Sequence, residues 1–191
     1  MAGRSTVAMR AKDLGLDLSN DTVNGVLEQL KTLEHAGYHF EVADASFELL
    51  LRTASGWQQD FFALESFRVI VEKQADGEVI TEATIKLQTR GERIIATAEG
   101  NGPVNALDQA LRKAIGQAHP ALAGIHLTDY KVRVLDTRKG TGAVTRVLID
   151  STNGDRSWTT IGVDENIIEA SWAALSDSVV YGLLQAETDS D

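Results

Sequence analysis

Hydrophobic positions along this chain follow two different periods. Over residues 20–55 they recur every three to four positions, which is typical of amphipathic helices. From Ser66 onward they alternate with polar residues, as in Phe67, Val69 and Val71, and this spacing is typical of half-buried strands. The change of period predicts a helical linker segment over 1–65 and a strand-rich domain over 66–191.

The first segment is predicted to contain three helices. A short one covers 5–14, a second has Asn20 or Asp21 as its N-cap, and a third runs from Asp44 as N-cap to about Ser55. Helices of this length do not stand alone in water, because their stability comes mainly from burying an apolar face. We therefore expect them to pack on each other and on another element.

The second segment repeats one pattern. Residues 66–117 and 128–184 each read as three short alternating stretches followed by an amphipathic helix, and a glycine, Gly100 or Gly162, precedes each helix. A sheet with one apolar face that is covered by a helix makes a two-layer α+β domain. The predicted fold is therefore two pseudo-repeated βββα units, a scaffold that places two equivalent loops around a shared cleft and favours ligand sensing.

Composition removes several classes of partner. The chain has 191 residues, of which 28 are acidic and 18 basic, so its net charge is −10, and it has no basic run. Nucleic acids and anionic membranes are therefore unlikely partners by charge, and solubility explains the charge simply. No stretch approaches the roughly 18 consecutive apolar residues of a membrane span, and cysteine is absent. These features favour a cytoplasmic location.

Catalytic machinery is not visible in the sequence. The four histidines are His35, His39, His119 and His126, and Gly37 interrupts the only pair at a spacing of four. No Gly-x-Ser-x-Gly elbow occurs and no thiol is available. We expect no catalytic residue, no metal site and no cofactor in this chain.

Two glycine-rich stretches have alternative interpretations. Residues 100–103 precede a helix, where free backbone N–H groups suit a carboxylate or phosphate, but taken alone they favour a plain turn with Pro103 in the first helical position. The matching turn of the second copy carries Asp164 and Glu165, so at most one copy binds an anion in this way. Residues 139–143 lack the ending of a P-loop and form either a ligand-facing loop or an ordinary hairpin.

Two aromatic residues differ in their expected roles. Trp172 lies on the apolar stripe of its helix and is interpreted as core. Tyr130 opens a strand beside the cleft expected between the copies. Its hydroxyl is either hydrogen-bonded in the core or exposed in a small apolar pocket.

Several motifs together resemble a known family. Residues 33–41 and 43–50 are similar to the helical segment downstream of the barrel in citramalate synthases. Residues 100–108, 129–134 and 162–171 resemble the C-terminal regulatory domain shared by citramalate and 2-isopropylmalate synthases. The motifs occur in the family's order and cover nearly the whole chain.

The resemblance implies the allosteric region of an acetyl-CoA-dependent acyltransferase without its catalytic part. In the family, catalysis resides in an N-terminal (β/α)₈ barrel that holds a divalent metal through a His-x-His pair and an acid, and none of this is present here. The regulatory domain forms a homodimer and binds the end-product amino acid at the dimer interface for feedback inhibition. The helical segment favours isoleucine, the product of the citramalate branch. The alternatives are leucine, as in 2-isopropylmalate synthases, and a dimerisation module without a ligand.

Effector-binding residues follow from the resemblance by matching motifs. Apolar side chains would enclose the branched chain of the effector, hydroxyls of Tyr130 and Thr141 would contact it, the backbone at 100–102 or at Thr141 would meet its carboxylate, and Glu165 or Asp164 its ammonium. Asn105 stands where an Asp is common in related sequences, and Thr145 is more polar than an aliphatic lining. The full expected set is Val104, Asn105, Leu127, Tyr130, Val134, Thr141, Ala143, Thr145, Glu165 and Ile167.

Overall fold

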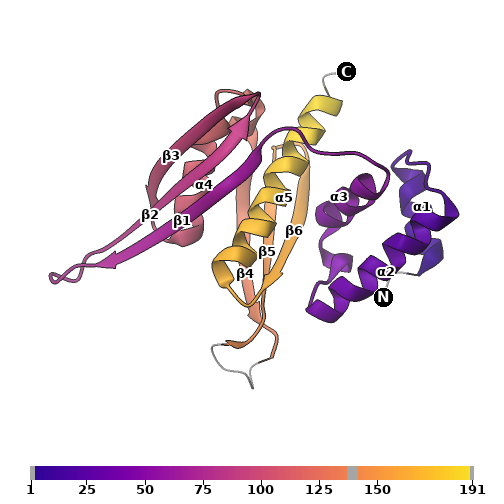
Figure 1. Cartoon of the computed structure of the whole chain (residues 1–191), viewed down its shortest axis with the longest axis horizontal. Coiled ribbons are helices and arrows are strands. Elements are labelled where there is room, and N and C mark those ends of the chain that lie inside the picture. The colour runs from indigo at the N-terminus through magenta and orange to yellow at the C-terminus, as the bar shows by residue number, and fades with distance from the viewer. Residues whose placement is uncertain (1–2, 137–141, 190–191) are drawn as a thin grey trace. The chain divides into compact units, whose positions relative to one another are not determined.

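The computed structural model describes residues 3–136 and 142–189, and within them the chain has the predicted α+β architecture (Figure 1). Two three-stranded antiparallel sheets are combined with five α-helices in the described residues. The elements in chain order are α1 (Arg4–Asp13), α2 (Asn20–Ala36), η1 (Phe40–Val42), α3 (Asp44–Ala54), β1 (Ala63–Lys73), β2 (Val79–Thr89), β3 (Glu92–Gly100), α4 (Pro103–Ile115), η2 (Pro120–Gly124), β4 (His126–Val134), β5 (Thr145–Thr152), β6 (Ser157–Asp164) and α5 (Ile167–Thr188).

Packing groups the chain into two compact units. The second-repeat unit comprises Met1–Gln58, Leu127–Ser151 and Ser157–Tyr181, and the first-repeat unit comprises Gln59–His126, Thr152–Arg156 and Gly182–Asp191. Helices α1 to α3 therefore share a unit with the second repeat. The division by function into 1–65 and 66–191 stays a prediction, and each unit is described below by itself.

In the first-repeat unit the sheet has the order β1-β2-β3, with antiparallel pairing throughout. Helix α4 covers the face on which Ala83, Ile85 and Leu87 are fully buried. Arg90 and Gly91 both have positive φ, as a two-residue turn between β2 and β3 requires. The hairpin of β1 and β2 extends beyond α4 (Figure 1).

In the second-repeat unit the order is β4-β5-β6, and α5 packs on one face of this sheet. The Trp158 indole donates to the carbonyl of Ser178 at 3.2 Å, and the Thr160 hydroxyl donates to that of Ala174 at 2.7 Å. A Cβ atom at Gly162 would collide with the backbone carbonyl of Ala170 on α5. Close approach of strand and helix therefore demands this glycine.

In the first repeat, too, close approach of the last strand to its helix requires a glycine. A Cβ atom at Gly100 would meet the backbone amide of Ala106 at 2.5 Å. The open position nearby is Gly102, where an added Cβ would contact nothing within 4 Å. The duplicated glycine of the sequence thus marks the point in each repeat where the last strand touches its helix.

The helix boundaries agree with the predictions, but two N-caps were predicted wrongly. Ser19, not Asn20 or Asp21, caps α2, and its hydroxyl accepts the amide of Thr22 at 3.1 Å. The residue in the N-cap position of α3 is Ala43, not Asp44. Asp44 is the first residue of α3, and its carboxylate accepts the backbone amide of Thr159 in β6.

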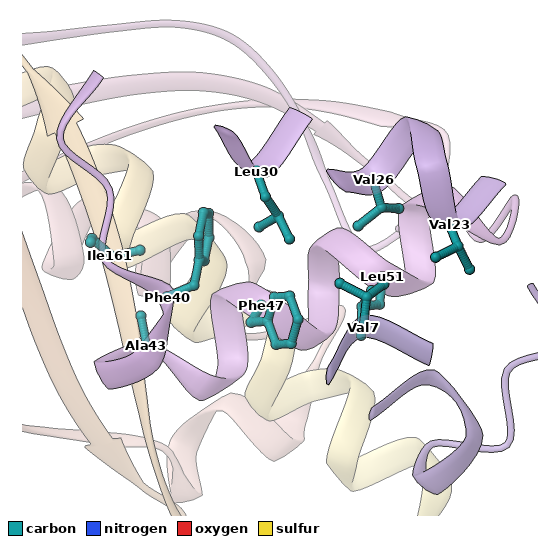
Figure 2. Close-up of a cluster of buried hydrophobic side chains, with 9 residues drawn as sticks. All are labelled: Val7, Val23, Val26, Leu30, Phe40, Ala43, Phe47, Leu51 and Ile161. Carbon is teal, nitrogen blue, oxygen red and sulfur yellow. The ribbon is translucent and has the colours of Figure 1, made fainter. Parts of the chain in front are cut away.

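Helices α1, α2 and α3 bury their apolar stripes in one cluster, which a residue of β6 completes (Figure 2). The expectation that these helices need a further element is therefore confirmed, and that element is the second sheet. The buried members are Val7, Val23, Val26, Leu30, Phe40, Ala43, Phe47, Leu51 and Ile161.

Helix α5 is long and apolar enough to cross a membrane by length and composition alone, with 61% of its most apolar stretch buried in this fold. Its burial has a local explanation. One side contacts the sheet through Ala174 and Ser178, and another contacts α3 through Asp177 and Tyr181. A core helix packed on two sides has little need of a charged face.

Candidate functional site

The first strand of the second repeat presents an apolar stripe. Tyr130, Val132 and Val134 occupy alternate positions of β4, so they share one face, and β4 is an edge strand. Their exposed fractions are 39%, 42% and 46%. This β4 stripe is the largest apolar exposure on the second sheet among the described residues, and such exposure on a folded protein marks a binding surface.

A chain of hydrogen bonds joins the β4 stripe to the start of α5. The Ser171 hydroxyl donates to the Ile167 carbonyl at 2.6 Å, so its single proton is used, and the Tyr130 hydroxyl 2.8 Å away must be the donor to Ser171. The lone pairs of the Tyr130 oxygen remain able to accept. Tyr130 and Ile167, which is 43% exposed, are thus brought together.

The other expected residues of the second repeat are more scattered. Leu127 is half-buried, and strand alternation puts it on the face opposite Tyr130 and Val134. Ala143 and Thr145 are buried near the start of β5. Thr141 lies outside the described residues.

The turn before α5 satisfies its own backbone. The Asn166 carboxamide oxygen accepts the amides of Ile168 and Glu169 at 2.9 and 3.4 Å, and Asp164 accepts the amide of Asn166 at 2.7 Å. The side chain of Glu165 is exposed. This helix start is therefore already capped by side chains of its own turn.

The matching turn in the first-repeat unit is capped differently. Gly102 is the N-cap of α4 and supplies no side chain. Val104 is half-buried in the first turn, and Asn105 is exposed with its carboxamide oxygen accepting the amide of Asn101 at 3.1 Å. Asn105 thus already shapes the turn. The part of these two residues in an effector site stays a prediction.

The first repeat carries an equivalent apolar stripe. Phe67, Val69 and Val71 alternate along β1, the edge strand of the first sheet, and lie on the same face as the residues under α4. Val71 and its neighbour Val79 on β2 are each 55% exposed. Sequence reasoning missed Val132 as a site residue, although its shared parity with Tyr130 and Val134 was a readable signal.

A second feature of the second-repeat unit is a cavity of about 510 Å³. Residues of α2, α3, β6 and α5 line it, with apolar walls that include Leu50 and Trp172. At its polar end the Ser46 hydroxyl donates to the Asp177 carboxylate at 2.7 Å. Burial raises the pKa of Asp177 to about 6, and this hydrogen bond opposes the rise.

Side chains of the helical segment occupy the free edge of β6 beside this cavity. The amide of Thr159 donates to Asp44 at 2.9 Å, and that of Ile161 donates to the Ser46 hydroxyl at 3.1 Å. Burial raises the pKa of Tyr38, and the nearby backbone of Val163 opposes the rise. Sequence reasoning found none of these contacts, because they join residues more than 100 positions apart.

Histidine chemistry does not define a site. His119 is buried, with its Nε2 atom 2.9 Å from the Phe61 carbonyl and 3.1 Å from the Thr89 hydroxyl, which is a structural arrangement. Within residues 3–136 and 142–189, no three His, Cys, Asp or Glu side chains are placed to hold a metal ion. The absence of catalysis, metal and cofactor stays an expectation.

Comparison with known proteins decides the family. The family described as the LeuA allosteric (dimerisation) domain matches residues 41–183. The chain belongs to this family. It is 53% identical over 189 residues to the (R)-citramalate synthase of Streptomyces coelicolor and 43% over 192 residues to that of Aquifex aeolicus, covering 97% and 99% of this chain. It is 29% identical over 190 residues to the 2-isopropylmalate synthase of Aquifex aeolicus, covering 97% of this chain.

The matches cover only 35%, 36% and 34% of those three proteins, so the chain spans about a third of the length of the curated relatives it matches. The resemblance drawn from the sequence motifs is confirmed. The chain is an allosteric dimerisation domain of the citramalate synthase and LeuA family.

Proposed function

We propose that this chain is the feedback-regulatory region of a cytoplasmic citramalate synthase, and that it binds isoleucine in a homodimer. The observation that carries the choice of synthase is the difference in identity, 53% and 43% to two citramalate synthases against 29% to a 2-isopropylmalate synthase. The catalytic partner would be a (β/α)₈ barrel in the same or a companion chain.

The β4 stripe supports an amino-acid site at the start of α5. Tyr130, Val134 and Ile167 offer apolar surface for a branched side chain, and the Tyr130 oxygen has lone pairs to accept a hydrogen bond. The exposed carboxylate of Glu165 is available to the ammonium group. A small ligand site combines apolar walls with a few polar groups, and this surface has both.

The exposed stripes support dimerisation. Val132 on β4 and Val71 on β1 leave apolar surface open at the edge strand of each sheet. A two-fold dimer would remove such surface from water by closed, self-complementary burial. Light scattering of the purified chain at micromolar concentration is expected to show a dimer, and Val132→Glu is expected to shift it toward monomer. A wild-type monomer with and without isoleucine would contradict this assembly.

Calorimetric titration with isoleucine, leucine and valine tests the effector. Isoleucine should bind most tightly, and valine should bind more weakly by about 1–3 kcal/mol, because one methylene in an apolar pocket is worth no more. Tighter binding of leucine would favour the 2-isopropylmalate alternative. Binding of none of the three would favour a dimerisation module without a ligand.

A further inference from the structure

An edge strand normally exposes a row of unpaired backbone groups, and β6 is the edge of the second sheet. Here the amides of Thr159 and Ile161, at alternate positions, both donate to side chains. Their partners are Asp44 and Ser46 from the helical segment. Side chains therefore take the place that a fourth strand would fill.

The middle contact reaches a further element. Ser46 accepts the Ile161 amide at 3.1 Å and donates its own proton to Asp177 of α5 at 2.7 Å. One hydroxyl thus joins α3, β6 and α5. Ser46 is buried, so losing this hydroxyl leaves the Ile161 amide without a partner where water has little access.

These contacts hold both elements that flank the turn over residues 164–166. That turn connects β6 to α5, and Asn166 within it caps the helix through the amides of Ile168 and Glu169. Any change in the turn moves the end of β6 or the start of α5. Ser46 bonds to both β6 and α5, so a shift of one relative to the other changes its hydrogen bonds.

We propose that Asp44 and Ser46, together with Asp177, form a latch that transmits the state of the turn before α5 to helices α2 and α3. The latch is a set of positioning residues and contacts no effector itself. The latch rests on the proposed function for the identity of the effector. It adds the route by which effector binding would change the positions of α2 and α3. The route stays within the second-repeat unit.

Amide hydrogen exchange on the full 191-residue chain tests the latch without any ligand. Ser46→Ala should speed exchange of the Ile161 amide by about tenfold, the effect of losing one buried hydrogen bond. The matched control is Ser55→Ala, because Ser55 ends the same helix and its hydroxyl bonds only to the Arg52 carbonyl. If Ser46→Ala unfolds the segment, Asp44→Ala replaces it. That variant removes the acceptor of the Thr159 amide and should speed exchange at Thr159 alone.

Transmission is tested by disturbing the turn from the other side. Asn166→Ala removes the cap of α5 and should speed exchange across α2 and α3 in the wild-type background. In the Ser46→Ala or Asp44→Ala background it should add no further change there. Equal effects of Asn166→Ala in both backgrounds, or no effect in the wild type, would overturn the latch.

Isoleucine supplies the second disturbance. Added to the wild type it should alter exchange in α2 and α3, whereas in Ser46→Ala it should bind with a similar dissociation constant and leave these helices unchanged. Retained transmission in Ser46→Ala contradicts the latch. Failure of isoleucine to bind the wild type contradicts the proposed function instead, and the Asn166→Ala comparison still decides the latch.

Discussion

The two βββα repeats share a plan but differ in what surrounds their last strand. The residue before the helix-contacting glycine is Glu99 in β3, which is exposed, and Ile161 in β6, which is buried in the cluster of the three N-terminal helices. Helix α4 accordingly carries exposed charge, as at Lys113, whereas α5 is packed on two sides. The two repeats therefore share a scaffold, and an apolar residue at this position of the second repeat contacts the helical cluster.

The largest expected effect concerns the feature that both repeats share. Gly162→Ala should destabilise the protein by about 3 kcal/mol or more, because the new Cβ meets the Ala170 backbone, which cannot move aside as a side chain can. Gly100→Ala should also be costly for the same reason. Thermal unfolding followed by circular dichroism measures both.

Gly102→Ala is the control for this pair, because space around it is open and its φ is −173°. It should change the free energy of unfolding by less than about 0.5 kcal/mol. A Gly162→Ala variant as stable as Gly102→Ala would show that β6 and α5 do not approach as closely as described.

The next effect separates the repeats. Ile161→Ala should cost about 2–5 kcal/mol, since it removes a buried side chain shared by β6 and the helical cluster. Glu99→Ala, at the matching position of the first repeat, should stay within about 0.5 kcal/mol of wild type. Urea unfolding of the two variants provides the comparison. Similar losses at both positions would mean that the last strands have equivalent surroundings.

Sequence periodicity was sufficient for the elements and insufficient for their partners. Alternation in β2 and helical spacing in α4 predicted both elements. Each of them buries one face against the other, so its own hydrophobic period reports which residues are buried. The N-cap of α3 was missed because Asp44 bonds to Thr159, 115 positions away, in preference to its own helix. The sequence does contain a signal that the N-terminal helices pack on the second repeat. Ile161 is apolar where Glu99 is charged, and this contrast identifies the strand that needs a cover.

The expected binding residues also depend on contacts between elements that sequence periodicity does not show. Tyr130 and Ile167 are linked because β4 and the start of α5 are joined through Ser171, which lies in a family-like motif but was not itself expected in the site. Leu127 was named with Tyr130 by matching motifs, yet a separation of three residues on a strand puts the two side chains on opposite faces. Motif matching therefore does not choose the residues on one face of a strand, and their part in effector binding stays a prediction.

A pH-dependent prediction concerns the α5 contact that the first repeat lacks. The pKa of Asp177 is raised from 3.8 to about 6, so the folded protein disfavours its charged form, and the penalty is complete above pH 6 and gone below about pH 4. Stability from this group therefore falls as pH rises through that window. Asp177→Asn keeps an acceptor for Ser46 and removes the charge, so it should be more stable than wild type at pH 7 by at most about 3 kcal/mol.

Urea unfolding of both proteins at pH 4 and pH 7 isolates this group, because the shared carboxylates cancel in the difference. The groups around Asp177 in the cavity include Tyr38, Ser46 and Glu169, and none of the residues lining it is Lys, Arg or His. The advantage of the variant should vanish at pH 4. An advantage that is constant across this range would assign the effect to packing rather than to charge.

The sharpest test of the β4 stripe comes from Tyr130→Ala. With isoleucine at one hundred times its dissociation constant, binding should stabilise the wild type by about 2.7 kcal/mol and raise its melting temperature. Tyr130 is 39% exposed and makes one side-chain hydrogen bond, so its loss should cost the unliganded protein only about 1 kcal/mol. The ligand-induced rise should fall far more, because part of the pocket wall is gone. Val71→Ala, in the matching stripe of the first repeat, should keep the rise; unfolding of Tyr130→Ala without ligand would make Tyr130 a core residue.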